Sequence, residues 1–303
     1  MITVLGPTAI GKTRLAALIA DALNGEIISA DSRQVYRKMN IGTGKDYEDY
    51  IVNGKTIKVH LVDIVDPGTE YNVFRFVEDF NIAYNSIVNN NKLPVLCGGS
   101  GLYIEAVIKD YYLPEVPINY ELRKKLENKS QEELVQILKS LKKNHNTTDF
   151  TDKNRTIKAI EIAEYLKSNP DYKNLGKNSL IIGITADRTF IREKISNRLQ
   201  KRIQQGLIDE VQQLITSGIT YEQLYYYGLE YRYIALYLQN KLSYSEMFAK
   251  LNIAINQFAK KQMTWFRRME KNNIKIHWLD AEQNDTDKLS VVKKLYVEWI
   301  NGK

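Results

Sequence analysis

A glycine-rich loop that ends in a lysine and a threonine lies close to the start of this 303-residue chain. Residues 6–13 read Gly-Pro-Thr-Ala-Ile-Gly-Lys-Thr, the G-x-x-x-x-G-K-T pattern that turns several backbone N–H groups toward one anion. Lys12 would add a positive charge there, and Thr13 a hydroxyl for Mg²⁺. The apolar run Ile2–Leu5 precedes the loop, and apolar residues at helical spacing follow it to Leu23. A strand and a helix thus flank the loop, and the pattern predicts a phosphate site rather than a structural glycine turn.

A carboxylate follows the second apolar run of the chain. Asp31 comes directly after residues 26–30, which places it at the carboxyl edge of a predicted parallel sheet, where ligands bind in open sheets. From its position alone it could be a metal ligand, a helix N-cap or a general base. Further on, Lys45 follows a glycine and could reach a phosphate or lie in solvent. Asp63 ends a strand-like run and weakly resembles the carboxylate of a Walker-B strand.

A second glycine-rich turn, Gly98-Gly99-Ser100-Gly101, follows the apolar run 93–97 and opens another helix. Such glycines allow the backbone to approach a ligand closely, and the Ser100 hydroxyl can both donate and accept a hydrogen bond. The alternative is a tight turn in which Ser100 caps the helix.

Strands alternating with helices predict a parallel sheet covered on both faces. The charged, almost wholly helical segment from about 118 to 176 indicates an insertion, because an apolar strand pattern returns after it. We therefore expect a catalytic core from residues 1–114 and 177–303, and a helical insertion domain from 115–176. The expected strands are residues 2–5, 26–30, 56–62, 93–97, 180–184 and 275–279; the expected long helices are 13–23, 72–89, 188–205, 206–217, 229–239 and 243–271.

The composition is that of a soluble globular protein, with 44% hydrophobic and 26% charged residues. The formal net charge of +7 favours a polyanionic partner, although a lysine-rich solvated surface would explain it equally well. The single cysteine, Cys97, excludes an internal disulfide and lies in an apolar run, so we expect a buried core residue and a reducing compartment. No apolar run approaches membrane-spanning length, and Met1 leads straight into a strand pattern. These features predict a cytoplasmic protein without a membrane segment.

The motifs taken together resemble the tRNA dimethylallyltransferases, also called tRNA isopentenyltransferases, over nearly the whole chain. The segments that carry the resemblance, in that family's order and spacing, are residues 6–13, 30–36, 40–45, 60–63, 98–103, 192–211, 227–232 and 256–267.

The resemblance implies a P-loop NTPase-like α/β fold with a helical insertion and a helical C-terminal part. It also implies transfer of a dimethylallyl group from dimethylallyl diphosphate to N6 of the adenine at position 37, next to the anticodon of tRNA. The leaving group is diphosphate, held by Gly6, Pro7, Thr8, Ala9, Ile10, Gly11, Lys12 and Thr13, with Mg²⁺ at Thr13. The implied partners are the tRNA anticodon stem-loop and dimethylallyl diphosphate, and we expect a monomer.

Roles in catalysis follow from the same resemblance. Lys12 and Arg198, with Lys194 as second choice, would stabilise the charge on the departing diphosphate. Asp31 would take the proton from N6, and Ser100, where the family usually has threonine, would orient that amine. The implied tRNA-binding residues are Asp31, Ser32, Arg33, Gln34, Ser100, Arg123, Arg155, Lys158, Arg232, Lys260 and Lys261.

Several positions depart from the family pattern or stay open. Asn256, Lys158 and Lys261 stand where the family commonly has arginine, and Lys142–Thr151 lacks the usual spacing. The cluster at 225–227 is either an RNA clamp or core packing. The helically spaced apolar residues of the last long helix are predicted to face the core: Phe248, Leu251, Ile255, Phe258 and Phe266.

Two other enzyme classes remain as alternatives at this point. One is a prenyltransferase acting on free adenine nucleotides, disfavoured by the basic C-terminal helix and the helical insertion. The other is a P-loop kinase, favoured by the Walker-B-like Asp63. A purely structural RNA-binding module would not need Asp31 and Lys12 at one edge of a sheet.

Overall fold

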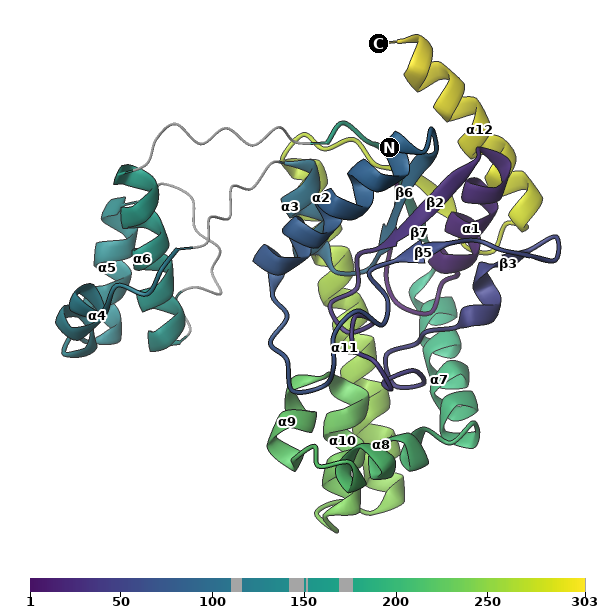
Figure 1. The fold of residues 1–303 in the computed structure, drawn as a ribbon. Helices are drawn as coiled ribbons and strands as arrows, with labels where there is room; N and C mark the ends of the chain where they lie inside the picture. The colour runs from purple at the N-terminus through teal and green to yellow at the C-terminus, as the bar shows by residue number, and fades with distance from the viewer. Residues whose placement is uncertain (110–115, 142–149, 151, 169–176, 303) are drawn as a thin grey trace. The chain divides into compact units, whose positions relative to one another are not determined.

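The computed structural model describes residues 1–109, 116–141, 150, 152–168 and 177–302 (Figure 1). The chain forms two compact units. The larger unit comprises Met1–Lys109 and Gly176–Lys303, and the smaller comprises Asp110–Leu175.

A parallel sheet forms the centre of the larger unit. Its six strands run in the order β5-β2-β6-β1-β7-β8, and every neighbouring pair is parallel. The strands are β1 (Ile2–Leu5), β2 (Gly25–Ser29), β5 (Val59–His60), β6 (Leu93–Gly98), β7 (Leu180–Thr185) and β8 (His277–Asp280). Because the strands are parallel, their carboxyl ends meet at one edge. The predicted α/β class is confirmed.

Helices cover both faces of this sheet, as Figure 1 shows. The helices of the larger unit are α1 (Lys12–Ala22), α2 (Val73–Asn89), α3 (Gly101–Ile108), α7 (Arg188–Gln204), α8 (Leu207–Thr216), α9 (Tyr221–Tyr226), α10 (Leu229–Leu238), α11 (Tyr244–Lys271) and α12 (Asp285–Asn301). Successive residues of each central strand belong to different hydrophobic clusters. In β6, for example, Val95 and Cys97 pack with α1 and α12, whereas Leu96 packs with α2, α3 and α11. The near-continuous apolar runs of the strands follow from this two-sided burial, and Cys97 is buried as predicted.

The expected strand at 56–62 is much shorter than predicted. Only Val59 and His60 join the sheet, because Thr56 pairs with Ile51 in a separate hairpin and Leu61 adopts a left-handed backbone conformation (φ 62°) that ends the extended run. Just before it lie a short 3-10 helix, Tyr47–Tyr50, and a hairpin of β3 (Ile51–Val52) and β4 (Lys55–Thr56). The sequence did not predict these short elements, nor α9 or α12.

The smaller unit is helical where it is described. Helices α4 (Tyr120–Glu127), α5 (Gln131–Leu141) and α6 (Lys153–Ser168) pack around a small core that includes Leu134 and Ile160. The departure noted for Lys142–Thr151 lies almost entirely outside the described residues.

A buried carboxylate on β2 contacts three basic side chains. Glu26, only 4% exposed, accepts hydrogen bonds from Lys92 (2.7 Å) and lies 2.7 Å from His60 Nε2 and 3.3 Å from Lys58 Nζ. Burial alone would raise the pKa of this carboxyl group, but the hydrogen bonds from Lys92, His60 and Lys58 lower it to about 2. Glu26 therefore stabilises the fold in its ionised form.

We expect Glu26→Gln to lower the free energy of unfolding by about 1.5–3 kcal/mol at pH 7, because it removes charge-assisted hydrogen bonds in a buried place. The lowered pKa places this stabilisation above the unfolded-state pKa near 4.5, and it is lost as the pH falls toward 2. Urea unfolding at pH 7, 5 and 3 should therefore show the two proteins converging at low pH. A difference that stays constant down to pH 3 would contradict this account. Lys58→Ala is the matched control: its side chain is 59% exposed, so we expect a loss below about 1 kcal/mol.

Candidate functional site

The phosphate loop joins β1 to α1, and its backbone has the conformation that such a loop needs. Gly6, Ala9 and Gly11 all have positive φ angles. At Gly6 a side chain is also excluded by space, because a Cβ atom there would lie 2.5 Å from the carbonyl oxygen of Ile184. Gly11 occupies the N-cap of α1 without a side-chain cap, so the first N–H groups of the helix are available to an anion.

Lys12 lies inside this loop and forms no ion pair with a carboxylate of the described residues. Its ammonium group donates a 2.5 Å hydrogen bond to the carbonyl oxygen of Pro7. The pKa of Lys12 is lowered to about 8, mainly by burial and also by Arg198, against the opposite effects of Cys97 and Asp31. A bound anion would favour the charged form of this lysine.

Gln262 of α11 connects the two glycine-rich turns. Its Oε1 accepts a hydrogen bond from the backbone N–H of Thr8 (2.9 Å), and its Nε2 donates to the carbonyl oxygen of Gly99 (3.0 Å). The side chain is buried, and it fills the place that a Cβ atom on Gly99 would need. The sequence pattern did not single out Gln262. The one usable signal was a polar amide at a position whose helical spacing matches the buried apolar residues of α11.

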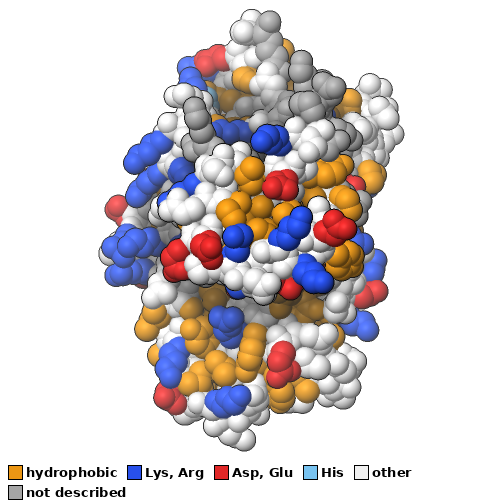
Figure 2. All heavy atoms as spheres, turned by 90° about the vertical axis from the view of Figure 1, so that its left-hand side faces the viewer, with side chains coloured by type: hydrophobic (Ala, Val, Ile, Leu, Met, Phe, Trp, Pro, Cys, Tyr) orange, Lys and Arg blue, Asp and Glu red, His pale blue; other side chains and the backbone are white. Residues whose placement is uncertain are grey.

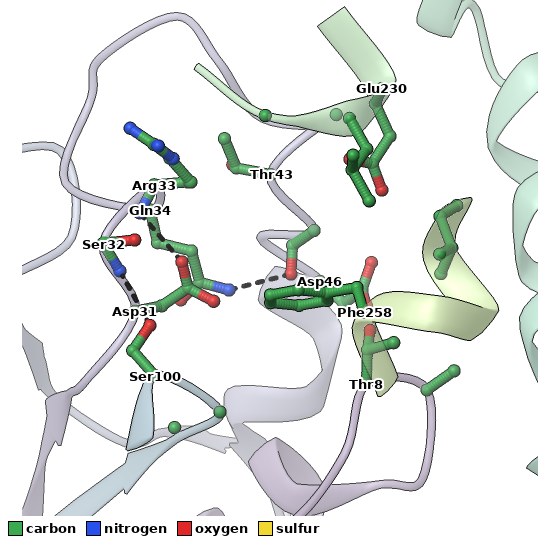
Figure 3. Close-up of a pocket in the computed structure, with 18 of the residues that line it drawn as sticks. Thr8, Asp31, Ser32, Arg33, Gln34, Thr43, Asp46, Ser100, Glu230 and Phe258 are labelled. Carbon is green, nitrogen blue, oxygen red and sulfur yellow. Dashed lines mark hydrogen bonds between the residues drawn. The ribbon is translucent and has the colours of Figure 1, made fainter. Parts of the chain in front are cut away.

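A pocket of about 510 Å³ opens at the carboxyl edge of the sheet (Figure 3). It is lined by residues 8–13, 29, 31–34, 42–44, 46, 49, 50, 97–100, 198, 202, 225–230, 232, 255, 258 and 262. The two glycine-rich turns, Asp31 and Arg198, which are far apart in the sequence, thus line one cavity. Figure 3 shows Asp31 and Ser100 on one side, Thr8 on the other, and the ring of Phe258 between them.

The side chains of Asp31 and Ser100 accept hydrogen bonds from the backbone of the turn that follows Asp31. The Oδ1 of Asp31 accepts a 2.8 Å hydrogen bond from the N–H of Arg33, and the residues after Asp31 form turns, so it is not a helix N-cap. Ser100 stands at the N-cap of α3 but makes no capping bond; its Oγ accepts from the N–H of Ser32 at 3.4 Å. The N-cap alternative is therefore wrong for Asp31, whereas Ser100 occupies the N-cap position of α3 without a side-chain capping bond; both residues line the pocket.

Two arginines of α7 line the pocket, and one of them contacts the phosphate loop. Arg198 donates to Thr8 Oγ1 (3.2 Å) and pairs with Asp46 at 2.5 Å. Arg202, one turn later, also lines the pocket and is buried. Lys194, the second choice for this role, packs over the Phe190 ring and does not line the pocket. The sequence pattern did not single out Arg202, although it follows Arg198 by four residues and so lies on the same face of the helix.

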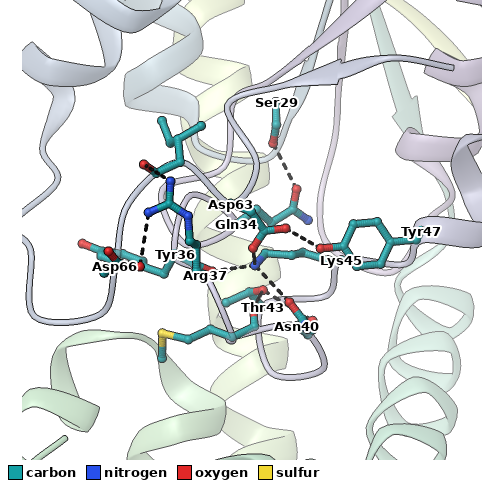
Figure 4. A network of polar contacts seen from close by, with 12 residues as sticks. Ser29, Gln34, Tyr36, Arg37, Asn40, Thr43, Lys45, Tyr47, Asp63 and Asp66 are labelled. Carbon is teal, nitrogen blue, oxygen red and sulfur yellow. Dashed lines mark hydrogen bonds and ion pairs between the residues drawn. The ribbon is translucent and has the colours of Figure 1, made fainter. Parts of the chain in front are cut away.

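Lys45 and Asp63 form a structural pair (Figure 4). Lys45 is 5% exposed and donates to Asp63 Oδ1 (2.5 Å), the Tyr36 carbonyl oxygen (2.6 Å) and Asn40 Oδ1 (3.2 Å). Tyr47 donates to the other oxygen of Asp63. Both alternatives for Lys45, a phosphate contact and a solvated side chain, are therefore wrong. Asp63 does not line the pocket, so the Walker-B interpretation is wrong as well.

Glu210 fixes the loop that carries Lys45. Its carboxylate accepts hydrogen bonds from the N–H groups of Asn40 (2.8 Å), Ile41 (2.8 Å) and Gly42 (3.0 Å), and from the hydroxyl of Tyr231 (2.7 Å). A Cβ atom on Gly42 would lie 2.5 Å from the Tyr231 ring. Three motifs, at 40–45, 192–211 and 227–232, thus meet through one carboxylate.

Aromatic side chains form part of the pocket wall. Phe258 is 44% exposed and lines the pocket, which corrects its predicted core position; Leu251, Ile255 and Phe266 are buried as predicted, and Phe248 packs partly buried against the core. The tyrosines of the 225–227 cluster differ in exposure. Tyr227 is buried, whereas Tyr226 is 45% exposed with the Arg33 guanidinium 4.6 Å from its ring centre.

The remaining candidate RNA contacts are spread over the chain. Ser32, Arg33, Gln34 and Arg232 line the pocket. Gln34 uses both ends of its amide within the protein, because it donates to the Gly44 carbonyl oxygen and accepts from Ser29 Oγ.

Other basic candidates lie away from the pocket. Lys260 and Lys261 are exposed on α11, and Arg155 is exposed on α6. Arg123 is held by Glu161 through two 2.8 Å hydrogen bonds, and Lys158 donates to the Val116 carbonyl oxygen. Figure 2 shows one face, on which basic side chains are interspersed with acidic and hydrophobic ones.

Comparisons with known proteins identify the family of this chain. The family model of IPP transferases matches residues 34–269. The tRNA dimethylallyltransferase 2 of Phocaeicola vulgatus is 54% identical over 297 residues, covering 97% of each chain. The tRNA dimethylallyltransferase 1 of Parabacteroides distasonis is 53% identical with the same coverage.

Solved structures give the same result. The tRNA isopentenylpyrophosphate transferase of Bacillus halodurans superposes with a TM-score of 0.72 at 28% identity, covering 98% of this chain and 95% of that one. Within the described residues, no helix is long and apolar enough to cross a membrane. By the match to the family model and by the identity to these relatives, the chain belongs to the IPP transferase family.

Proposed function

We propose that this protein transfers a dimethylallyl group from dimethylallyl diphosphate to N6 of the adenine at position 37 of tRNA, releasing diphosphate. The observation that carries the proposal is the two-ended pocket. Lys12 and Arg198 line it with the phosphate loop, where Arg198 donates to Thr8. Figure 3 shows Asp31 and Ser100 on the side opposite Thr8. The family and the names of its similar members support the same activity.

The cationic end suits a diphosphate leaving group. Negative charge grows on the diphosphate as the bond between carbon and oxygen breaks, and fixed donors stabilise charge that develops in the transition state. Lys12 and Arg198 bring two positive charges to the loop, where the backbone N–H groups and the α1 N-terminus already favour an anion.

The residues at this end also fit a magnesium ion. In the described residues there is no cluster of three or more carboxylate, histidine or cysteine side chains that could hold a metal by themselves. Mg²⁺ is commonly held by one or two protein oxygens together with substrate phosphates, and the Thr13 hydroxyl lines the pocket beside the loop. The ion would neutralise charge on the diphosphate.

The other end suits an adenine amine. The N6 amine is a poor nucleophile because its lone pair is delocalised into the ring. Its N–H becomes acidic as N6 gains positive charge in forming the new bond to carbon, and a carboxylate such as Asp31 can accept that proton. The Ser100 hydroxyl would orient the amine. Phe258 and Tyr226 offer exposed aromatic faces on the pocket wall for a base drawn out of the anticodon loop.

We further propose that Lys260 and Lys261, with Arg155 and Lys158 of the smaller unit, contact the phosphates of the anticodon stem-loop, and that the enzyme is a cytoplasmic monomer. Arg123 is better placed to position Glu161 than to bind RNA, because its Nε and Nη2 atoms already donate to that carboxylate, which also accepts a hydrogen bond from the N–H of Asn119 at the N-cap of α4. The kinase alternative loses its main support, since Asp63 pairs with Lys45 away from the pocket.

The proposal is tested by offering labelled dimethylallyl diphosphate and Mg²⁺ to the purified protein with an anticodon stem-loop, AMP or ATP. We expect label on the RNA alone. Label on AMP would assign the chain to the enzymes that prenylate free nucleotides, and ATP turnover without a prenylated product would favour a kinase.

Asp31→Asn should slow the chemical step about 10²–10⁴-fold, because the amide cannot accept the proton. The amide oxygen can still accept the hydrogen bond from Arg33, so the turn should be preserved. Single-turnover transfer and stem-loop binding measure the two effects separately. Ser100→Thr, which keeps the hydroxyl, is the control and should remain within about 10-fold of the original rate. An unchanged rate for Asp31→Asn would remove Asp31 as the base.

The double variant Lys260→Ala with Lys261→Ala should weaken stem-loop binding and reduce the slope of log affinity against log salt by about 1–2, because it removes two phosphate contacts. Lys250→Ala, an exposed lysine on the same helix paired with Glu246, is the matched control. Equal salt slopes for the double variant and this control would refute the assignment.

A further inference from the structure

Arg202 is a buried arginine with donors that the protein leaves unused. The residue is only 7% exposed. Its Nε and Nη2 atoms are buried, and neither has a hydrogen-bond partner among the described residues. The nearest carboxylate oxygens, of Asp46 and Glu230, lie 3.7 Å from Nη2 and 3.9 Å from Nη1, beyond hydrogen-bond distance. A buried, unsatisfied guanidinium is costly and calls for a specific explanation.

The surroundings of Arg202 destabilise its positive charge, so a bound anion would be favourable there. Burial lowers its pKa to about 10, and Arg198 contributes in the same direction, so two like charges share one small region. Asp46 is the carboxylate they have in common, and it lies closer to Arg198, at 2.5 Å. Burial raises the pKa of Glu230, which weakens the other possible counter-charge.

The backbone makes room for both guanidinium groups. At Gly44 a Cβ atom would lie 2.1 Å from Arg202 Nη2 and 2.7 Å from Arg198 Nη2, and the residue has a left-handed φ of +73°. Gly44 and both arginines line the pocket, together with Thr8 of the phosphate loop, to which Arg198 donates. Arg202 therefore lines the cavity in which the diphosphate is proposed to bind, and its Nε and Nη2 donors have no partner in the described residues.

We propose that Arg202 is a second arginine for the diphosphate, binding its oxygens beside Arg198, and that Asp46 holds the two guanidinium groups in place before the anion arrives. This proposal rests on the proposed function, because it names the same ligand. The diphosphate supplies the acceptors that Arg202 lacks in the protein. Its negative charge also relieves the repulsion between the two arginines.

The alternative is that Arg202 only balances Glu230 in the core. The two possibilities differ in what Arg202→Met does. Methionine is unbranched and flexible and so suits a buried site, and it removes all the guanidinium donors. A ligand role predicts a loss of diphosphate affinity, whereas a purely structural role predicts a loss of thermal stability with affinity unchanged.

Calorimetric titration of the full chain with inorganic diphosphate and Mg²⁺ tests the proposal without requiring transfer. We expect Arg202→Met to weaken diphosphate binding about 10–100-fold, the effect of losing charge-assisted hydrogen bonds. Arg202→Lys, which keeps the charge but not the fork of donors, should fall in between and remains informative if the methionine variant does not fold. Lys201→Met, an exposed neighbour on the same helix, is the matched control and should stay within about 2-fold.

The outcomes separate this proposal from the proposed function. Unchanged diphosphate affinity in both Arg202 variants, with stem-loop transfer intact in the original protein, would overturn the role of Arg202 alone. Failure of the original protein to bind diphosphate would overturn both. Weakened binding in the Arg202 variants together with equal weakening in Lys201→Met would show a general charge effect and would also refute the specific role.

Discussion

Positive charge concentrated at one end of a pocket is the physical constraint on which the rest of this structure depends. Lys12, Arg198 and Arg202 line one pocket, yet within the described residues the protein supplies only Asp46 and more distant carboxylates to balance them. Like charges repel, and the low-dielectric interior strengthens that repulsion. The fold must therefore hold these cations in place until an anion binds. The hydrogen bonds around the pocket do this by restraining the loops and helices that carry the cations.

Three contacts over long sequence separations provide this support. Gln262 ties the phosphate loop to the second glycine-rich turn, and Glu210 fixes residues 40–42 through their backbone N–H groups. Glu105 of α3 accepts hydrogen bonds from Trp265 and Arg268 of α11, so the helix that carries Gln262 is anchored near its C-terminal end. Each contact restrains a loop or helix that lines the pocket, which is the kind of preorganisation that stabilising a transition-state charge requires.

The parts of the site that the sequence predicted are those encoded by short segments. The phosphate loop needs only one strand, one turn and one helix, and the parallel sheet brings Asp31 and Ser100 to the same edge once the strands are assigned. Interactions that depend on tertiary packing could not be predicted from the sequence. Lys45 is surrounded by polar residues in the sequence, and only the fold shows that it is buried against Asp63. The helical spacing of Phe258 favoured the core, but the residue lies between the buried Ile255 and Ala259 in the middle of α11 and is exposed at the pocket. For α9, the Thr220 and Gln223 capping box was a usable signal.

The measurement that tests the account most directly is a crystal structure of the protein with an anticodon stem-loop and a donor analogue in which sulfur replaces the bridging oxygen, so that transfer is slowed. The account predicts diphosphate oxygens against the loop N–H groups, Lys12 and Arg198, and an unstacked adenine with N6 facing Asp31. A nucleobase bound at the phosphate loop, or an adenine amine directed away from Asp31, would contradict it.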